Sequence, residues 1–407
     1  DKDYAAARDL LLQSLRTART AESYCDLGEA YSYMGNKNEA VITFENAIKL
    51  DPKCHKAYAC IAELLLSEGH IFHAIDYYVL AIQAKPDSLQ YRQNFLTLAR
   101  HLQIKAFNKD VKNILTDSLK IKDLNFSKTI GVWSQLLQKD PAFKDILKAV
   151  GKDQKDTYAA FKKASATKHR AYLDPYFLLG IKNEIVASLP FEKFMTYLRR
   201  FMLEQYDTQS PVFSESEYIQ VATSLAGNCL LTDYIFNSTA EEQDKIKALK
   251  CGKDTDLRLL SILACYEPIY KIPGIAEISS KYKATAPEFI DTHIDDFEIQ
   301  KEIRESISTI TKISEGTSAL VREQYEEFPY PRWTNYDRTA FNEEIEGRFR
   351  NGKFNILNAG CGTGHEAICL GSLYPNSKVL AVDLSRTSLA FAIKRARDYN
   401  IKNVDFR

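Results

Sequence analysis

The 407-residue sequence lacks an excess of charge of either sign, because 54 Lys and Arg residues balance 54 Asp and Glu residues. Without a global positive field, the chain as a whole is not typical of nucleic-acid-binding proteins, although charge can still be concentrated locally. The lysine-rich stretch 101–170 is one such concentration. Its aromatic residues Phe126 and Trp133 follow the spacing of an apolar helix side, and acids such as Asp123 break up the positive charge. We therefore favour a solvated helical surface and predict no nucleic-acid partner.

Long apolar runs and paired cysteines are also missing. No run approaches the roughly 20 residues needed to span a bilayer, and the N-terminus lacks the apolar core of a signal peptide. The eight cysteines show neither a C-x-x-C pair nor a Cys/His zinc spacing, which is typical of reduced thiols, so we predict a cytoplasmic protein. His70 and His73 have no third ligand nearby in sequence, so we predict no metal site.

The first part of the chain contains an internal repeat. Tyr24 matches Tyr58 and Pro52 matches Pro86, an offset of 34 residues. The positions between them that follow the same offset are Leu27, Gly28, Tyr31, Ala40, Phe44 and Ala47, matched by Ile61, Ala62, Leu65, Ala74, Tyr78 and Ala81. This is the period and pattern of tetratricopeptide repeats, in which each unit is a helix hairpin.

We predict that the repeat array covers residues 1–103, with two full repeats flanked by partial ones. Stacked hairpins of this kind generally offer a concave groove, so a protein or peptide is the expected partner. The alternative is a structural spacer or a dimerisation arm, and a homodimer is kept as an expectation.

Residues 104–287 have the pattern of helices that do not repeat. Apolar residues recur there at intervals of three and four positions, as in Phe191, Phe194, Leu198 and Phe201. Asp174 followed by Pro175 is a typical helix start, with the acid as the cap. We predict a helical middle domain with a regulatory or dimerisation role, followed over residues 288–350 by a helical linker and lid.

The linker contains an unusual segment, residues 321–333, in which Pro329 and Pro331 halt a helix and fix an extended path. Tyr325 lies on the helix, and the extended path presents Tyr330, Arg332 and Trp333. These four residues are the candidates for a lid or a substrate channel. Rigid aromatic residues just before a nucleotide-binding strand are candidates for a lid over a cofactor or substrate channel. The alternative, weighed equally, is that Tyr330 and Trp333 anchor the linker on the next domain by apolar burial.

A glycine loop near the end of the chain carries the strongest functional signal. An apolar run leads into Gly360-Cys-Gly-Thr-Gly364, and a helix-like segment and a second apolar run closing on Asp383 follow. A dinucleotide site needs G-x-G-x-x-G, but here the third glycine comes one position early and His365 stands where the last glycine is required. A P-loop is excluded because no Gly-Lys-Ser/Thr follows.

This pattern resembles the class I S-adenosylmethionine-dependent methyltransferases, whose first motif is G-x-G-x-G after the first strand and whose second strand ends in an acid. The resemblance implies S-adenosyl-L-methionine as cofactor, with both ribose hydroxyls on Asp383 and the backbone at Gly360 and Gly362 passing close to the ligand. The implied cofactor-binding residues are Asn358, Gly360, Cys361, Gly362, Gly364, Asp383 and Leu384. One departure is Asn358, where many family members carry an acid whose charge would hold the amino group of the methionine.

The repeats, residues 224–236, residues 321–333 and the glycine loop together look like bacterial tetratricopeptide-containing methyltransferases. The middle region is also similar to the regulatory region of rickettsial-type protein lysine methyltransferases. These resemblances imply in-line attack of a nucleophile on the sulfonium methyl, with the protein mainly holding donor and acceptor together away from water. They also imply a protein substrate recruited by the repeats. The alternative is a repeat-based interaction or regulatory scaffold with a non-catalytic remnant of a nucleotide fold.

The predicted fold is mostly α: tetratricopeptide repeats and a helical middle region, followed by the truncated start of an α/β Rossmann-like methyltransferase domain over residues 351–407. Residues 404–407 have the pattern of the start of its third strand. The residues that deprotonate an acceptor commonly follow the fourth strand in this fold. We therefore expect the catalytic residues, which the sequence leaves unknown, to lie beyond residue 407, and the native protein to extend before Asp1. We expect this chain by itself to be inactive and to bind the cofactor poorly unless a partner completes the sheet.

Overall fold

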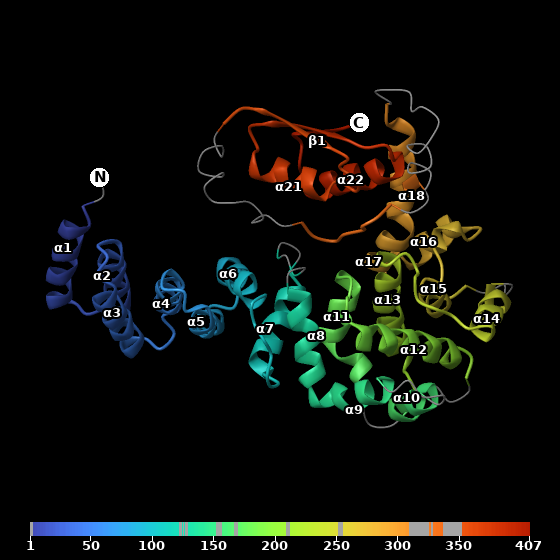
Figure 1. Cartoon of the computed structure of the whole chain (residues 1–407), viewed down its shortest axis with the longest axis horizontal. Helices are drawn as coiled ribbons and strands as arrows, with labels where there is room; N and C mark the ends of the chain where they lie inside the picture. Colours follow the sequence, from blue (N-terminus) through green and yellow to red (C-terminus); the bar gives the residue numbers. More distant parts are fainter. Residues whose placement is uncertain are drawn as a thin grey trace. The chain divides into compact units, whose positions relative to one another are not determined.

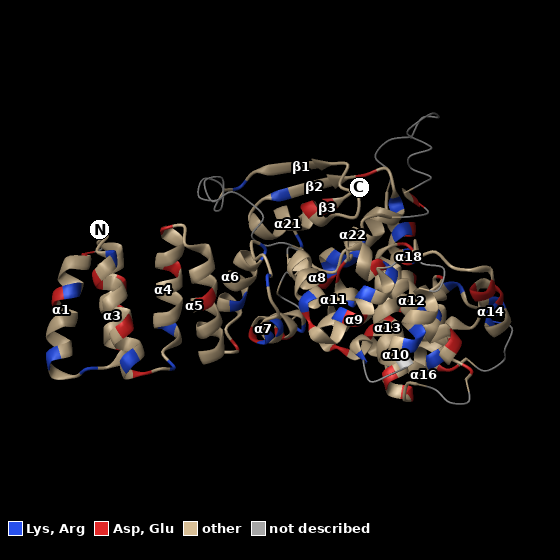
Figure 2. Cartoon of the chain, turned by 60° about the horizontal axis from the view of Figure 1, so that its bottom comes forward, with Lys and Arg blue, Asp and Glu red and all other residues tan. Residues whose placement is uncertain are grey.

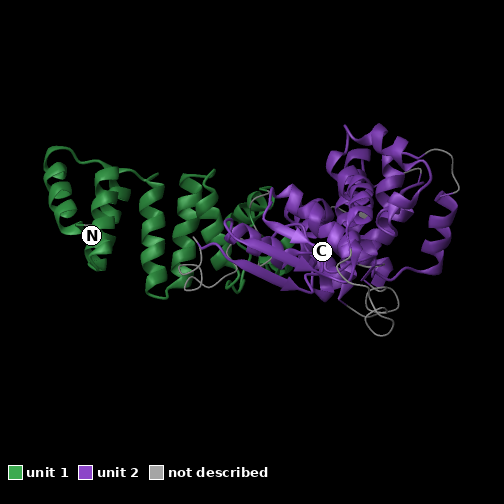
Figure 3. Cartoon of the chain, turned by 90° about the horizontal axis from the view of Figure 1, so that it is seen from above, with its two compact units in different colours: residues 1–141 green, residues 142–407 purple. Residues whose placement is uncertain are grey.

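The computed structural model describes residues 3–121, 124, 126, 129–151, 157–166, 170–208, 212–250, 255–308, 325–326, 329–336 and 352–407. These residues form a mostly helical chain with helix hairpins at the N-terminus and a small parallel sheet at the C-terminus (Figure 1), which confirms the predicted fold class. The chain divides into two compact units, Asp1–Pro141 and Ala142–Arg407 (Figure 3). The four-part division predicted from the sequence, with boundaries after residues 103, 287 and 350, stays a prediction.

The first unit is built from helix hairpins. Its helices are α1 (Tyr4–Thr17), α2 (Ala21–Tyr33), α3 (Lys37–Leu50), α4 (His55–Ser67), α5 (Ile71–Ala84), α6 (Leu89–Ala99), α7 (Lys109–Leu119) and α8 (Ile130–Lys139). Within the two predicted repeats, α2 packs on α3 and α4 packs on α5. The aromatic residues Phe44 and Tyr78 are both buried. A Cβ at Gly28 would lie 2.5 Å from the Phe44 ring, so this glycine allows the close approach of α2 and α3.

The lysine-rich stretch 101–170 contains a local ion pair and buried aromatic residues where the structure describes it. Lys112 Nζ lies 2.6 Å from the Asp140 carboxylate, and Figure 2 shows basic and acidic residues mixed along α7. The aromatic residues Phe126 and Trp133 are buried in the core. The buried rings agree with the predicted apolar helix side, and the absence of a nucleic-acid partner stays a prediction.

The helical part of the second unit surrounds an aromatic core. Its helices are α9 (Pro141–Val150), α10 (Thr157–Ala166), α11 (Pro175–Asn183), α12 (Leu189–Gln205), α13 (Glu215–Leu231), α14 (Ala240–Lys250), α15 (Leu257–Leu263), α16 (Ile275–Tyr282), α17 (Pro287–Ile290) and α18 (Asp296–Ser306). Rings that pack on one another in the interior belong to Phe143, Phe161, Phe177, Phe191, Phe194 and Phe201. As predicted, α11 starts with Pro175, and the Asp174 carboxylate caps it by accepting from the Phe177 amide at 3.0 Å.

The C-terminal part of the second unit is a β-α-β-α-β arrangement. Its elements are β1 (Asn355–Ala359), α21 (His365–Leu373), β2 (Lys378–Val382), α22 (Arg386–Asp398) and β3 (Val404–Phe406). The strands are parallel in the order β1-β2-β3, with Leu357 opposite Leu380 and Leu380 opposite Asp405. The third strand predicted to start within residues 404–407 is confirmed as β3, which ends at Phe406.

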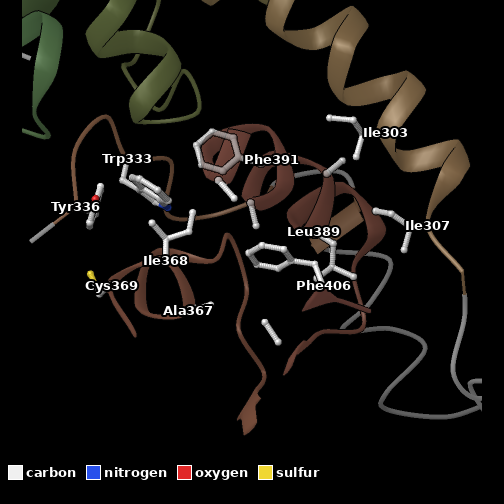
Figure 4. Close-up of a cluster of buried hydrophobic side chains, with 14 residues drawn as sticks. Ile303, Ile307, Trp333, Tyr336, Ala367, Ile368, Cys369, Leu389, Phe391 and Phe406 are labelled. Atoms are coloured by element: carbon white, nitrogen blue, oxygen red, sulfur yellow. The ribbon is translucent and has the colours of Figure 1, made fainter. Parts of the chain in front are cut away.

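A hydrophobic core joins this α/β region to the helices before it. Ile303 of α18, Trp333 of the linker, Ile368 of α21, Phe391 of α22 and Phe406 of β3 belong to a shared cluster of buried side chains (Figure 4). α18 packs along α22, which fixes the α/β region against the helical part of the same unit. The linker is therefore part of the core of the α/β region where the structure describes it.

Two sequence-based expectations concern membranes and metals. No helix within the described ranges is both long and apolar enough to cross a membrane. The ring centroids of His70 and His73 are 6.1 Å apart. Among the residues that the structure describes, no three His, Cys, Asp or Glu side chains come together in a way that could hold a metal ion.

Candidate cofactor site

The glycine loop, residues 360–364, joins the carboxyl end of β1 to the start of α21. The amides of Gly360 and Cys361 donate to the Val382 carbonyl at 2.8 and 3.0 Å, so the loop is tied to the end of β2. The Gly364 amide donates to the Cys361 carbonyl at 2.9 Å and closes a tight turn. The loop thus lies across the carboxyl ends of neighbouring parallel strands, which is where ligands bind in open α/β sheets.

The three glycines of the loop meet different surroundings. All three have left-handed backbones, with φ values of 72° at Gly360, 51° at Gly362 and 78° at Gly364. A Cβ at Gly360 or Gly362 would meet no atom within 4 Å, whereas one at Gly364 would lie 2.4 Å from the Ala392 Cβ. The first two glycines therefore leave open space beside the backbone, and the third allows α21 to pack closely on α22.

Asp383 lies just after β2 and is fixed against the glycine loop. One carboxylate oxygen accepts from the Gly362 amide at 2.8 Å, and the other accepts from the Ser385 amide at 2.9 Å. A carboxylate offers about four lone-pair sites, so each oxygen can still accept a second hydrogen bond from a ligand. The neighbouring Leu384 is 42% exposed. This geometry orients the Asp383 carboxylate before any ligand is present.

Cys361 has the environment of a neutral packing residue. Its side chain is partly buried against the core of the α/β region. Burial, together with the negative charge of Asp383, raises the pKa of the Cys361 thiol to about 12. The thiol is therefore protonated at neutral pH and is a poor nucleophile.

Asn358 of β1 and Glu366 of α21 form a polar pair beside the loop. Asn358 Nδ2 donates to Glu366 Oε2 at 3.0 Å. Asn358 Oδ1 is buried and has no hydrogen-bond partner among the described residues. The Glu366 side chain lies in the first turn of α21, where a carboxylate is favoured by the helix dipole.

Trp333 is anchored to the glycine loop through Thr363. Trp333 Nε1 donates to the Thr363 carbonyl at 3.1 Å, and Thr363 Oγ1 donates in return to the Pro331 carbonyl at 2.7 Å. Trp333 is 9% exposed, and its ring contacts the His365 ring edge-on, with centroids 5.1 Å apart. These contacts support the anchoring alternative for Trp333.

Arg332 contacts the helical part of the unit. Its Nε lies 3.6 Å from the Asp233 carboxylate, and its guanidinium lies 5.0 Å from the centre of the Phe297 ring. Burial lowers the pKa of Arg332, while the charge of Asp233 opposes this shift. Thr334 Oγ1 also donates to the Asn183 carbonyl at 2.7 Å. The segment from Pro331 to Thr334 therefore connects the glycine loop to the ends of α11 and α13.

The two remaining lid candidates are open to solvent. Tyr330 is 53% exposed and Tyr325 is 41% exposed. Their role in a lid or substrate channel stays a prediction, and residues 321–324 of the predicted segment lie outside the described residues.

Glu326 is a site-supporting residue that sequence reasoning missed. Its carboxylate accepts from the Arg386 amide at 2.5 Å and from Thr387 Oγ1 at 2.9 Å, and it pairs with Arg304 at 2.8 Å. It thereby satisfies the first amide of α22, next to the helix cap Ser385. Its place in the sequence carries no signal for this role, since Glu326 and Arg386 are 60 positions apart.

The geometry defines a glycine loop and an acid at the carboxyl edge of a parallel α/β sheet. Comparison with known proteins gives this region a class: residues 351–407 match a family described as "Methyltransferase domain". Residues 21–54 match a family described as "Tetratricopeptide repeat". The chain therefore combines a repeat of the predicted kind with a methyltransferase-domain sequence.

One relative is similar over a short stretch. "Protein SGT1 homolog" of Oryza sativa subsp. japonica is 42% identical over 67 residues, which cover 15% of this chain and 18% of that protein. The match thus spans less than a fifth of the relative.

Proposed function

We propose that this chain contains the cofactor-binding part of an S-adenosylmethionine-dependent methyltransferase. The observation that supports the proposal most strongly is the pairing of Asp383 with the glycine loop, where Gly360 and Gly362 leave open space beside a left-handed backbone. A ribose with two adjacent hydroxyls would donate to the free lone pairs of the Asp383 carboxylate. Adjoining ligand atoms would fill the space that a Cβ would take at the two glycines. The residues present thus fit a ribose-containing cofactor.

The cofactor would supply the methyl group on a positively charged sulfur. Gly360 and Gly362 would let the ligand approach the backbone, and Asp383 would orient its ribose. The hydrogen bonds that join Trp333 to Thr363 and Thr363 to Pro331 would hold the loop in place. Such positioning is the main contribution expected of the protein, because methyl transfer to a deprotonated nucleophile needs little further acid or base chemistry.

The acceptor that we propose is a protein recruited by the tetratricopeptide repeats. The repeat match at residues 21–54 supports this proposal, since repeat solenoids present extended surfaces to partners. We also propose that the chain is related to bacterial repeat-containing and rickettsial-type lysine methyltransferases. A homodimer formed by the helical regions is a further proposal.

A labelling experiment tests the enzymatic proposal. The protein is incubated with methyl-labelled S-adenosylmethionine and a cell lysate, and label should appear on one or a few proteins. Label found in the small-molecule fraction alone would contradict a protein substrate. The D383N variant, which keeps the shape of the side chain but weakens the ribose contact, is the control and should transfer less label. The 407-residue chain, assayed in the same way, tests the expectation that it is inactive by itself.

A scaffold without catalysis is the second candidate, and the tetratricopeptide match favours it as much as it favours recruitment. In that case the α/β region would bind no cofactor or would only sense it. Partner capture that is unaffected by D383N, together with no label transfer by any form of the protein, would favour the scaffold.

A further inference from the structure

We propose that Glu366, held by Asn358, supplies the negative charge that binds the ammonium group in the methionine part of S-adenosylmethionine. The inference rests on the proposed function. It concerns which residue carries the negative charge for the ammonium group, because residue 358 is a neutral amide.

The first step is the direction of the Asn358 side chain. A carboxylate can only accept hydrogen bonds, so the 3.0 Å contact with Glu366 Oε2 fixes Nδ2 toward α21. Asn358 Oδ1 must then point the other way, where it is buried and has no donor among the described residues. A buried acceptor without a donor costs about 1–3 kcal/mol. A ligand that brings N–H groups to this end of the loop would remove that cost.

The second step is the charge balance around the glycine loop. Asp383 has both oxygens directed at backbone amides next to the proposed ribose position. Glu326 is paired with Arg304. Glu366 is exposed, and no Lys or Arg forms an ion pair with it in the described part of the chain. Glu366 is therefore a carboxylate beside the loop that remains available to a cation.

The third step is the complementarity of the pair. Two carboxylates at hydrogen-bond distance would repel, and one of them would have to take up a proton. An amide on β1 and a carboxylate on α21 avoid this repulsion and keep one negative charge near the end of β1. In this pair the negative charge therefore lies on the first turn of α21 and not on β1.

The bland alternative is that Glu366 only stabilises the start of α21 through the helix dipole. If Glu366 only stabilises the helix, its replacement should affect the binding of all ligands equally. If it binds the ammonium group, its replacement should weaken S-adenosylhomocysteine, which carries the amino-acid group, but not 5′-methylthioadenosine, which lacks it.

The test compares the binding of these two ligands by calorimetric titration, carried to ligand concentrations high enough to measure weak binding. E366Q should weaken S-adenosylhomocysteine roughly tenfold or more, as expected for a lost charge-assisted contact, and should leave 5′-methylthioadenosine unchanged. The double variant N358D/E366Q returns one carboxylate and one amide to the pair in exchanged places and should recover most of the lost affinity. N358D alone should not improve binding, because it places two carboxylates together.

The control is D405N, which removes an exposed acid of the same α/β region that pairs with Arg407 at 3.1 Å. It should change the affinity for neither ligand, and thermal unfolding should show that all variants fold. Equal effects of E366Q on both ligands, or no effect on either, would overturn the inference and leave the proposed function standing. Failure of the unmodified protein to bind either ligand would instead contradict the proposed function, and this inference with it.

Discussion

Gly28 in the first repeat and Gly362 in the glycine loop meet opposite surroundings. A Cβ at Gly28 would lie 2.5 Å from the Phe44 ring, whereas a Cβ at Gly362 would meet nothing within 4 Å. The glycine of the repeat serves the packing of two helices, and the glycine of the loop keeps space open beside a backbone with φ of 51°. Gly364 belongs to the loop but resembles Gly28, because α22 lies against it. Open space beside a glycine, more than the glycine itself, therefore marks the ligand side of the loop.

The largest effect on stability is expected at Gly364. G364V places a side chain against Ala392 on a backbone with φ of 78°. Left-handed strain and overpacking together should lower the free energy of unfolding by about 2–5 kcal/mol. The chain has two tryptophans, Trp133 in the first unit and Trp333 in the second, so denaturation followed by fluorescence in a W133F background reports the second unit.

The matched comparison for this variant is G362A. It carries the left-handed strain without a clash and should cost only about 1–2 kcal/mol, while it fills space proposed for the ligand. Equal stability losses in G362A and G364V would remove the distinction between the open and the packed side of the loop.

The next effect is expected in the first repeat. G28A forces a methyl group toward the buried Phe44 ring and should lower the free energy of unfolding by about 1–3 kcal/mol. Denaturation monitored through Trp133 measures it. F44L makes room for the added methyl group, so the double variant should be more stable than the sum of the single changes predicts. Simple additivity would show that the two side chains do not meet.

A smaller effect is expected where the linker supports the loop. W333F removes the Nε1–H that satisfies the Thr363 carbonyl, and an unsatisfied carbonyl should cost about 1–2 kcal/mol. Unfolding followed by circular dichroism measures this cost without relying on the deleted tryptophan. Y330F changes an aromatic residue that is 53% exposed and should stay within about 0.5 kcal/mol of the unmodified protein. A similar loss in both variants would argue against the anchoring contact.

The smallest effect concerns Cys361, whose pKa is raised by burial and by the charge of Asp383. D383N removes that charge, so the thiolate becomes less unfavourable, the pKa falls, and alkylation at mildly alkaline pH should speed up several-fold. Cys60 is the comparison in the repeats, because burial and the charges of Glu29 and Glu63 raise its pKa. Its alkylation rate, read by peptide mass spectrometry, should not change. Unchanged labelling of Cys361 would contradict the contact between Asp383 and the loop.

The parts of the structure that the sequence predicts depend on local patterns. The 34-residue offset predicts the paired helices α2 to α5, and G-x-G-x-G between two apolar runs predicts a loop between β1 and α21. The contacts that support the loop depend on residues far apart in the chain. Arg332 meets Asp233, and Glu326 meets both Arg304 and Arg386. No periodicity links such partners, because the fold alone brings them together.

The central claim is that Asp383 and the glycine loop hold a ribose-containing methyl donor. Its most direct test is a titration of the chain with S-adenosylhomocysteine, beside the D383N variant. We predict weak but saturable binding by the unmodified chain and a loss of roughly tenfold or more in D383N, as expected when hydrogen bonds to a charged acceptor are weakened. Absence of saturable binding, or equal binding by the two proteins, would contradict the claim.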